Sequence, residues 1–253
     1  MERKIIYTAD GSRTVSIPEL NVTYHSIHGA IQESKHVFIE AGLYGSDLPI
    51  AIGIQHSHPT SILEMGFGTG LNALLTLIES EKLDQNIYYE TIEAFPLTID
   101  EARALNYCGI LERNDLQKTF EEFHTCEWEK EVVLGSNFIF KKRKVNLFNF
   151  EMPTPMAGIE TSSVSSPGTS GTCLFGRQAF DLIFFDAFAP DVQPELWTEE
   201  IFEKMFLLLR CKGALVTYSS KGKVRRAMEA AGFKVEKIPG PPGKREMVRA
   251  IKI

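Results

Sequence analysis

The sequence lacks any apolar run long enough to cross a membrane as a helix, which takes about 20 residues. Its first residues, MERKIIYTADGS, also lack the apolar core and the small-residue cleavage site of a secretory signal peptide. Hydrophobic residues make up 43% of the 253 residues and charged residues 24%, which is an ordinary composition for a globular protein. We therefore expect a cytoplasmic protein without a membrane partner.

Cysteine is scarce, with four in 253 residues, and none of them forms a C-x-x-C pair. They lie far apart in the sequence, at Cys108, Cys126, Cys173 and Cys211. This spacing predicts reduced, mostly buried thiols rather than a disulfide framework or a zinc site. The segment QHSHP at 55–59 holds two histidines without a third ligand nearby, so it predicts a polar loop. We expect no metal in this protein.

An excess of positive charge is also absent, because 33 acidic residues face 27 basic ones and the formal net charge is -6. This argues against a partner that is held by bulk charge alone, such as non-specific duplex DNA. RNA stays possible as a partner, because basic residues cluster at 141–144, 221–226 and 243–245. Each cluster taken singly is more typical of a solvated face.

From residue 61 onward, short apolar runs alternate with segments of helical periodicity. Alternating strands and helices predict a parallel sheet covered by helices. The last two apolar runs, at 233–238 and 246–253, are joined only by PGPPGKR, so we expect them to pair antiparallel. About seven strands with a final antiparallel hairpin predict an α/β, Rossmann-like fold of the class I S-adenosylmethionine-dependent methyltransferases, rather than a dehydrogenase.

Two regions do not follow this alternation. Residues 1–60 contain a turn at Asp10-Gly11 followed by alternating residues, which predicts a small β-rich extension that packs on the core formed by 61–253. Residues 152–172 are rich in Ser, Thr, Gly and Pro and predict a flexible surface insertion. A lid over a site and a loop without function are both compatible with that composition.

The stretch LEMGFGTGLN at 63–72 follows a predicted strand and opens a predicted helix. Gly66, Gly68 and Gly70 permit tight turns and the close approach of a ligand. The dinucleotide-binding pattern G-x-G-x-x-G requires glycine at 71, where this sequence has leucine. Glu64 at the strand end suits a cationic ligand, such as the amino group of S-adenosylmethionine, better than a pyrophosphate. The alternative is a glycine-rich turn without a ligand.

The next predicted strand ends in TIEAF, where Glu93 lies 23 residues after Gly70. An acidic residue at this place in such a fold can bind both ribose hydroxyls of a nucleoside. The alternative is a surface glutamate. A glycine loop between strand and helix, followed by an acidic residue at the end of the second strand, therefore favours a nucleoside cofactor.

In the run IFFDAFAP at 183–190, which follows Leu182, an aspartate comes directly after four apolar residues that predict a buried strand. In open α/β sheets ligands bind beyond the carboxyl ends of the strands, so Asp186 is expected beside the cofactor. Our hypothesis is that Asp186 accepts hydrogen bonds from a substrate amine and holds it aligned for attack on a methyl group. A carboxylate that caps the following turn is the alternative.

Four segments together resemble the methyltransferase part of the MnmC family: EMGFGTGLN, FFDAFAPDVQPELW, VTYSSKGKVRRAMEAAGF and the late GKREM. The resemblance covers most of the chain except 152–172. It implies an enzyme that uses S-adenosylmethionine to methylate the aminomethyl group on the wobble 2-thiouridine of tRNA, forming 5-methylaminomethyl-2-thiouridine. In this sequence Ala187 follows the key aspartate where many members have glycine.

The resemblance also assigns residues to roles. It implies cofactor binding by Glu64, Gly66, Gly68, Gly70, Asn72 and Glu93, and a catalytic part for Asp186. It places Lys244, Arg245 and Glu246 near the substrate entrance. Tyr24 in the N-terminal part is a further substrate-binding candidate, together with its neighbours His25 and Ser26, against the alternative of a strand with a half-exposed histidine. The adenine contact is expected from Asn149 or Glu151.

The bifunctional members of the family also carry a flavin oxidase domain, which this chain does not contain. A separate oxidoreductase or other tRNA-modification enzyme is therefore expected to supply the aminomethyl substrate. Two other functions stay open on the sequence alone. One is methylation of a small-molecule amine, and the other is a non-catalytic RNA-binding scaffold on the same fold.

Overall fold

The protein is described by a computed structural model that covers residues 2–45, 59–150 and 180–253. The insertion predicted at 152–172 lies outside these described residues, and so does Glu151. Among the described residues, no helix combines the length and the hydropathy that a membrane span needs.

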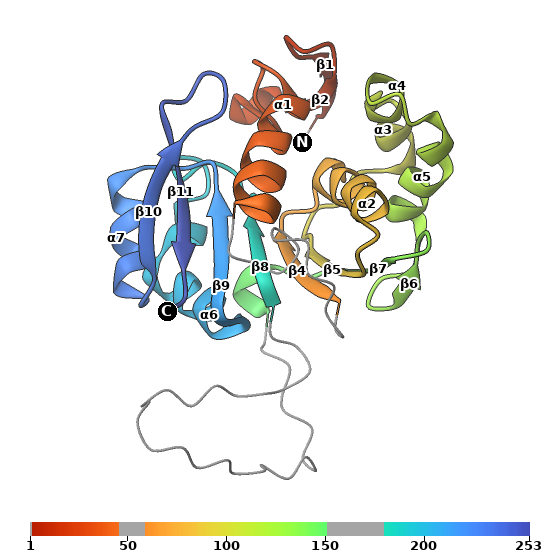
Figure 1. Cartoon of the computed structure of the whole chain (residues 1–253). Helices are drawn as coiled ribbons and strands as arrows, with labels where there is room; N and C mark the ends of the chain where they lie inside the picture. Colours follow the sequence, from red (N-terminus) through yellow and green to blue (C-terminus); the bar gives the residue numbers. More distant parts are fainter. Residues whose placement is uncertain (1, 46–58, 151–179) are drawn as a thin grey trace.

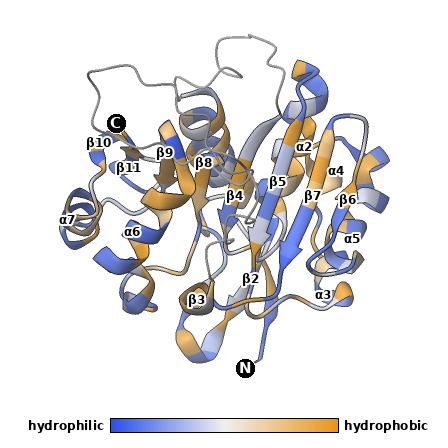
Figure 2. Ribbon diagram, turned by 90° about the horizontal axis from the view of Figure 1, so that it is seen from below, coloured by the Kyte–Doolittle hydropathy of each residue, from blue (hydrophilic) through white to orange (hydrophobic). Residues whose placement is uncertain are grey.

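A twisted sheet of eight strands forms the centre of the molecule, in the order β10-β11-β9-β8-β4-β5-β7-β6 (Figures 1 and 2). Its strands are β4 (Thr60–Met65), β5 (Ile87–Ile92), β6 (Glu131–Val133), β7 (Phe138–Arg143), β8 (Phe180–Phe185), β9 (Leu209–Thr217), β10 (Lys234–Pro239) and β11 (Glu246–Ile251). The five strands from β9 to β7 pair in parallel. The strands β10, β11 and β6 at the two edges pair antiparallel. The predicted fold class and its final antiparallel hairpin are confirmed.

The eighth strand comes from the segment 131–143, which folds back on itself as the hairpin of β6 and β7. Gly135 lies in the connecting turn with φ +80°, a conformation that glycine adopts without steric cost. The β10–β11 hairpin extends the opposite edge, because β11 pairs with β9 and β10 pairs only with β11.

Alternate residues of the central strands face opposite sides of the sheet, and both sides are covered by helices. In β8, Phe184 belongs to one buried cluster and Phe185 to the other. The first cluster lies under α1 (Ala30–Ser34), η2 (Lys35–Tyr44), α2 (Leu71–Leu83) and α5 (Gln117–Thr125). The second lies under α6 (Glu199–Leu208) and α7 (Gly222–Ala230). Burial on both faces explains why these strands read as continuous apolar runs.

The N-terminal segment begins with a small antiparallel sheet in the order β1-β2-β3, formed by β1 (Lys4–Tyr7), β2 (Arg13–Ile17) and β3 (Val22–Thr23). The predicted hairpin at Asp10-Gly11 is thus present, and Gly11 has φ +81°. The chain then continues through α1 into η2, which has π-helical hydrogen bonding and packs on the main sheet beside α2 (Figure 1). The division of the chain at residue 60 stays a prediction.

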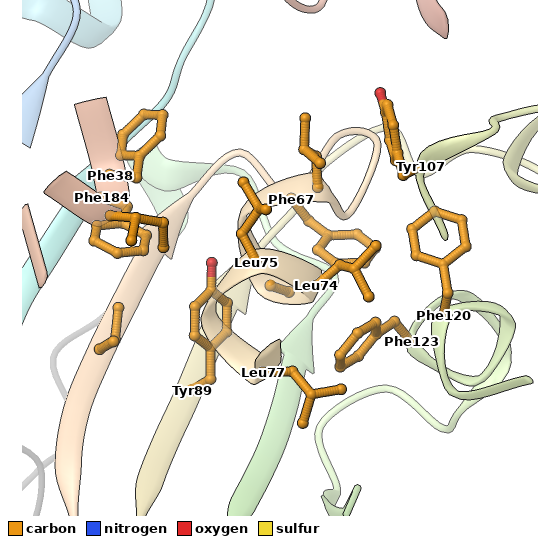
Figure 3. Close-up of a cluster of buried hydrophobic side chains, with 14 of the residues drawn as sticks. Phe38, Phe67, Leu74, Leu75, Leu77, Tyr89, Tyr107, Phe120, Phe123 and Phe184 are labelled. Carbon is orange, nitrogen blue, oxygen red and sulfur yellow. The ribbon is translucent and has the colours of Figure 1, made fainter. Parts of the chain in front are cut away.

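A cluster of aromatic side chains fixes the N-terminal helices and the glycine loop against the sheet (Figure 3). Phe38 of η2 packs on Phe184 of β8 with ring centroids 5.1 Å apart. Phe67, inside the glycine loop, packs on Phe140 of β7 at 5.8 Å. Such rings bury large apolar areas, so this cluster holds η2 and the glycine loop on the same face of the sheet.

The remaining short elements lie in the connections. They are η1 (Pro18–Leu20), α3 (Ile99–Arg103), α4 (Tyr107–Ile110), η3 (Asn114–Leu116), η4 (Leu147–Asn149) and η5 (Pro194–Trp197). The expectation of reduced thiols is wrong for Cys211, which is disulfide-bonded, whereas Cys108 and Cys126 are free and Cys173 lies outside the described residues. Distance along the sequence carries no information on distance in the fold, which is what decides whether two thiols can be bridged.

Candidate functional site

A cavity of about 520 Å³ opens at the carboxyl ends of β4, β5 and β8. This is the edge at which open α/β sheets bind their ligands. Its wall is formed by the loops that follow these three strands and by residues 21–26 of the N-terminal segment. Among the candidates from the sequence, the side chains or backbone of Tyr24, Gly66, Gly68, Glu93, Asp186 and Lys244 line it. The fold therefore brings together residues that are spread over 220 positions of sequence.

The glycine loop after β4 takes a backbone path that requires glycine. Gly66, Gly68 and Gly70 have φ values of +94°, +51° and +76°, where a side chain is strained. A Cβ atom at Gly66 would lie 2.8 Å from the carbonyl oxygen of Asp186. The first loop and the loop after β8 thus touch through their backbones. Gly70 faces Phe67 and His124 rather than the cavity.

Glu93 closes the other side of the glycine loop. Its Oε2 accepts a hydrogen bond of 2.8 Å from the Gly68 N–H, and its Oε1 accepts one of 2.7 Å from the Phe95 N–H. The carboxylate therefore fixes the loop and at the same time faces the cavity. Its contact with a ribose stays a prediction.

Asn72 joins two carboxylates at the base of the cavity. Its Nδ2 donates to Glu64 Oε1 at 3.0 Å and to Asp186 Oδ2 at 2.9 Å. Glu64 also accepts from Thr91 Oγ1 at 2.8 Å and is fully buried, so its pKa is well above the usual range, with burial as the main cause. Glu64 does not line the cavity as described, and it acts on Asp186 through Asn72. The Asn72 Oδ1 atom is buried without a hydrogen-bond partner among the described residues.

Asp186 follows the last residue of β8, and its backbone N–H donates to Met65 O at 3.0 Å. Removal from water raises its pKa to about 7, and the negative charge of Glu33 acts in the same direction. The hydrogen bond from Asn72 and the positive charge of Lys244 act against this rise. A carboxylate whose pKa lies near neutrality can both accept and release a proton at physiological pH.

Glu33 was missed by the sequence analysis, yet it lies in the cavity wall beside Asp186. It comes from α1 and is 8% exposed. Its Oε2 accepts from the Ser26 N–H at 2.7 Å and its Oε1 from Lys244 Nζ at 2.7 Å. In sequence it is one polar residue of the helix-compatible stretch at 29–43, so no local signal distinguishes it.

Three substrate-binding candidates lie in different surroundings. Tyr24 faces the cavity, packs edge-on against Phe188 at 5.1 Å, and has its pKa raised to about 12 by burial. Arg245 and Glu246 do not line the cavity as described. Both oxygens of Glu246 accept from Lys237 Nζ at 2.9 Å on the β10–β11 hairpin. Of the GKREM motif, only Lys244 reaches the site.

The two residues expected to contact the adenine are Asn149 and Glu151. Asn149 is the last residue of η4, and Glu151 lies outside the described residues. The residues just before Asn149, at 145–148, line the cavity. This segment follows β7, whose neighbour in the sheet is β5. The adenine contact stays a prediction.

Two histidines, the buried His25 and the half-buried His124, stabilise the loops around the cavity in their neutral form. His25 Nε2 is hydrogen-bonded to Thr69 Oγ1 at 2.6 Å, and burial lowers its pKa to about 4. His124 packs on Phe67 at 5.0 Å, and burial together with the charge of Lys142 lowers its pKa to about 4. Both groups must gain a proton when the chain unfolds in mild acid.

We expect the free energy of unfolding to fall as the pH drops from about 6.5 towards 4, because the unfolded chain then binds protons that the folded chain excludes. His25→Gln keeps a partner for Thr69 but does not titrate. Urea unfolding at pH 7 and pH 5 should therefore show a loss about 2 kcal/mol smaller in the variant than in the parent protein. The raised pKa values of Asp186 and Glu64 increase the stability as the pH falls. Both groups are present in the parent and in the variant, so their effect cancels in this comparison. An equal loss of unfolding free energy in both proteins would contradict the lowered pKa of His25.

Known proteins identify the class to which this site belongs. A family model described as S-adenosyl-L-methionine-dependent methyltransferase matches residues 170–253. The crystal structure of MNMC2 from Aquifex aeolicus superimposes with a TM-score of 0.67 over 98% of this chain and 70% of its own, at 22% identity, which supports the fold. The fold is therefore that of the class I S-adenosyl-L-methionine-dependent methyltransferases, and the family model matches the last third of the chain.

Within that class, the resemblance to the MnmC family is confirmed by named relatives. The tRNA 5-methylaminomethyl-2-thiouridine biosynthesis bifunctional protein MnmC of Leptospira borgpetersenii is 30% identical over 229 residues, which cover 89% of this chain and 31% of the relative. The protein of the same name from Leptospira interrogans is 32% identical over 232 residues, or 89% and 32% of the two chains. This chain thus spans about a third of the length of the curated relatives it matches.

The residues of the cavity fit the cofactor of this class. Gly66 and Gly68 line the cavity without side chains, so a ligand can approach their backbone closely. Glu93 and the segment 145–148 face the cavity from neighbouring strands. Among the described residues, no group of three or more His, Cys, Asp or Glu side chains could hold a metal ion.

Proposed function

We propose that this protein transfers a methyl group from S-adenosyl-L-methionine to the aminomethyl group on the wobble 2-thiouridine of tRNA, forming 5-methylaminomethyl-2-thiouridine. The observation that carries the proposal is Asp186, a carboxylate with a pKa of about 7 in the cavity beside the glycine loop. The names of the MnmC relatives supply the pathway. The residues that would hold the cofactor at the cavity wall are Gly66, Gly68 and Glu93. Behind them, Gly70, Glu64 and Asn72 would support the loop and Asp186.

The chemistry of an amine substrate explains why a carboxylate is needed. When bound, S-adenosyl-L-methionine supplies a methyl group that is activated by its sulfonium sulfur. An alkylamine is protonated at neutral pH and has no free lone pair in that form. Asp186 accepts a proton from the nitrogen and leaves the lone pair available, while its hydrogen bond with Asn72 holds the carboxylate in place.

Partners follow from this substrate. We propose that tRNA reaches the cavity across the basic residues at the start of α7, where Lys221 and Lys223 form ion pairs with Asp191 on the cavity rim. Contacts from lysine and arginine to phosphates are a general source of affinity for RNA. A separate oxidoreductase or another tRNA-modification enzyme would supply the aminomethyl nucleoside. With tRNA as substrate, the reaction belongs to the cytoplasm.

We expect methyl-labelled S-adenosyl-L-methionine to transfer label to tRNA that carries 5-aminomethyl-2-thiouridine, with the label recovered in 5-methylaminomethyl-2-thiouridine by nucleoside mass spectrometry. The same tRNA without the aminomethyl group is the control and should stay unlabelled. Spermidine, offered separately, tests methylation of a small-molecule amine. Cofactor binding without label in the tRNA would overturn the proposal, and label in spermidine alone would favour the small-molecule function.

A further inference from the structure

The cavity already holds one primary ammonium group, which belongs to the protein itself. Lys244, in the loop between β10 and β11, places its Nζ 2.7 Å from Glu33 Oε1 and 3.9 Å from the centre of the Tyr218 ring. All three residues line the cavity together with Asp186. A carboxylate and an aromatic face are the two groups that bind an alkylammonium ion most effectively.

Glu33 and Tyr218, the two residues that bind this ammonium group, are fixed in place by other hydrogen bonds. Glu33 Oε2 is held by the Ser26 N–H at 2.7 Å, so that Oε1 points to the cation. The Tyr218 ring is oriented by its hydroxyl, which donates to Ala187 O at 2.8 Å. Glu33 comes from α1, which covers one face of the sheet, and Tyr218 directly follows β9, a strand of the sheet itself. The subsite therefore exists independently of the cation in it.

The side chain of Lys244, which donates this hydrogen bond, is held less firmly. The side chain of Lys244 is 35% exposed, against 10% for that of Glu33. It reaches the subsite along a flexible four-carbon stem from a surface loop. No other contact of its Nζ is present among the described residues beyond those with Glu33 and Tyr218. An incoming cation could replace it without any movement of the sheet.

We propose that Glu33 and Tyr218 form the subsite for the protonated amine of the substrate, and that Lys244 fills this subsite until the substrate displaces it. The end of a lysine side chain, CH2–NH3+, is the same chemical group as a protonated aminomethyl substituent. Glu33 and the Tyr218 ring receive the ammonium form, and Asp186 beside them then accepts its proton. This inference rests on the proposed function, because it assigns the amine of that substrate to a place.

Displacement also gives the enzyme a means of discrimination. A tRNA that lacks the aminomethyl group cannot replace Lys244, whose ammonium then stays paired with Glu33. A tRNA that carries the group restores the same carboxylate and aromatic contacts with its own ammonium. Lys244 is released into the cavity entrance, where it can contact a phosphate.

The test compares equilibrium binding of two tRNAs, with and without the aminomethyl group on 2-thiouridine, in the presence of S-adenosylhomocysteine so that no methyl transfer occurs. Lys244→Met removes the ammonium but keeps the length of the side chain. We expect this variant to bind the aminomethyl tRNA about tenfold more tightly than the parent protein does. This is the effect of a subsite that Lys244 leaves free about one tenth of the time in the parent protein. Its affinity for the unmodified tRNA should not increase. Lys234→Met, on the exposed side of β10, is the matched control and should change neither affinity.

The second variant removes the receiving charge. Glu33→Gln keeps an acceptor for the Ser26 N–H, and it should bind both tRNAs equally, because the preference for the aminomethyl form is lost. Equal weakening of both tRNAs by Lys244→Met would overturn the proposal, since it would show Lys244 to be a phosphate contact only. A preference that survives in a folded Glu33→Gln protein would overturn it as well. If Glu33→Gln does not fold, the binding measurements with Lys244→Met are sufficient to test the subsite.

These outcomes are separate from those of the proposed function. A preference for the aminomethyl tRNA that depends on Glu33, without any methyl transfer, would leave the subsite standing and reject the reaction. Methyl transfer that is insensitive to both variants would leave the reaction standing and reject the subsite.

Discussion

Asp186→Asn is expected to lower the rate of methyl transfer by about 10²–10⁴-fold, the usual contribution of a positioned general base. Asparagine has nearly the same shape and can still accept the hydrogen bond from Asn72 Nδ2, but it cannot take a proton from the substrate amine. Affinity for S-adenosyl-L-methionine, measured by calorimetry, should change little because the fold of the glycine loop is retained. An unchanged transfer rate would exclude Asp186 as the base.

The pH dependence of the same reaction provides a second signature. A base must be deprotonated to act, so single-turnover rates should rise with pH up to about 7 and level off above it. The matched control is Asp181→Asn, which makes the same chemical change at the opposite end of β8, where the carboxylate binds Arg210 and the Ser61 N–H. This variant should lose some stability but keep the transfer rate and its pH profile.

Gly66→Ala should lower the free energy of unfolding by about 1–3 kcal/mol, the cost of a strained backbone at one residue. Two effects act together. The φ angle of +94° is unfavourable for alanine, and the new Cβ would lie 2.8 Å from the Asp186 carbonyl oxygen, which belongs to the backbone and cannot rotate away. The two loops must therefore separate, so cofactor affinity should fall by at least tenfold as well.

Gly109→Ala is the matched control for that variant. Gly109 lies in α4 without a positive φ, and a Cβ there meets only the Asn114 side chain at an ordinary 3.8 Å. Alanine should stabilise this position by about 0.5–1 kcal/mol. Urea unfolding and calorimetric titration of both variants provide the measurements. A Gly66→Ala protein with parental stability and cofactor affinity would show that the loop does not need glycine at this position.

Much of the site was predictable because its signals are local. Gly66 and Gly68 stand out in sequence because a glycine-rich turn must follow a strand and open a helix. Asp186 stands out because a carboxylate directly after four apolar residues is costly unless it has a role. The structure places these residues on one cavity wall, since parallel strands bring their carboxyl ends to the same edge of the sheet.

Other parts could not be predicted, because they depend on contacts between distant segments. Glu64 was expected to meet a ligand, whereas the structure buries it behind Asn72, where it is one step removed from the cavity. Three consecutive residues of GKREM were expected at the entrance. Lys244 lies in the turn between β10 and β11, whereas Glu246 is already the first residue of β11 and binds Lys237 across the hairpin.

The sequence by itself determined the alternation of strands and helices, the final antiparallel hairpin, the glycine loop and the position of Asp186. Each of these follows from the order of polar, apolar and glycine residues within a few positions. Only the tertiary structure decided that Glu33 and Lys244, 211 residues apart, form an ion pair beside Asp186. The physical reason is that this pairing depends on how the N-terminal helices pack across the sheet, through contacts such as Phe38 on Phe184, and no local pattern encodes that packing.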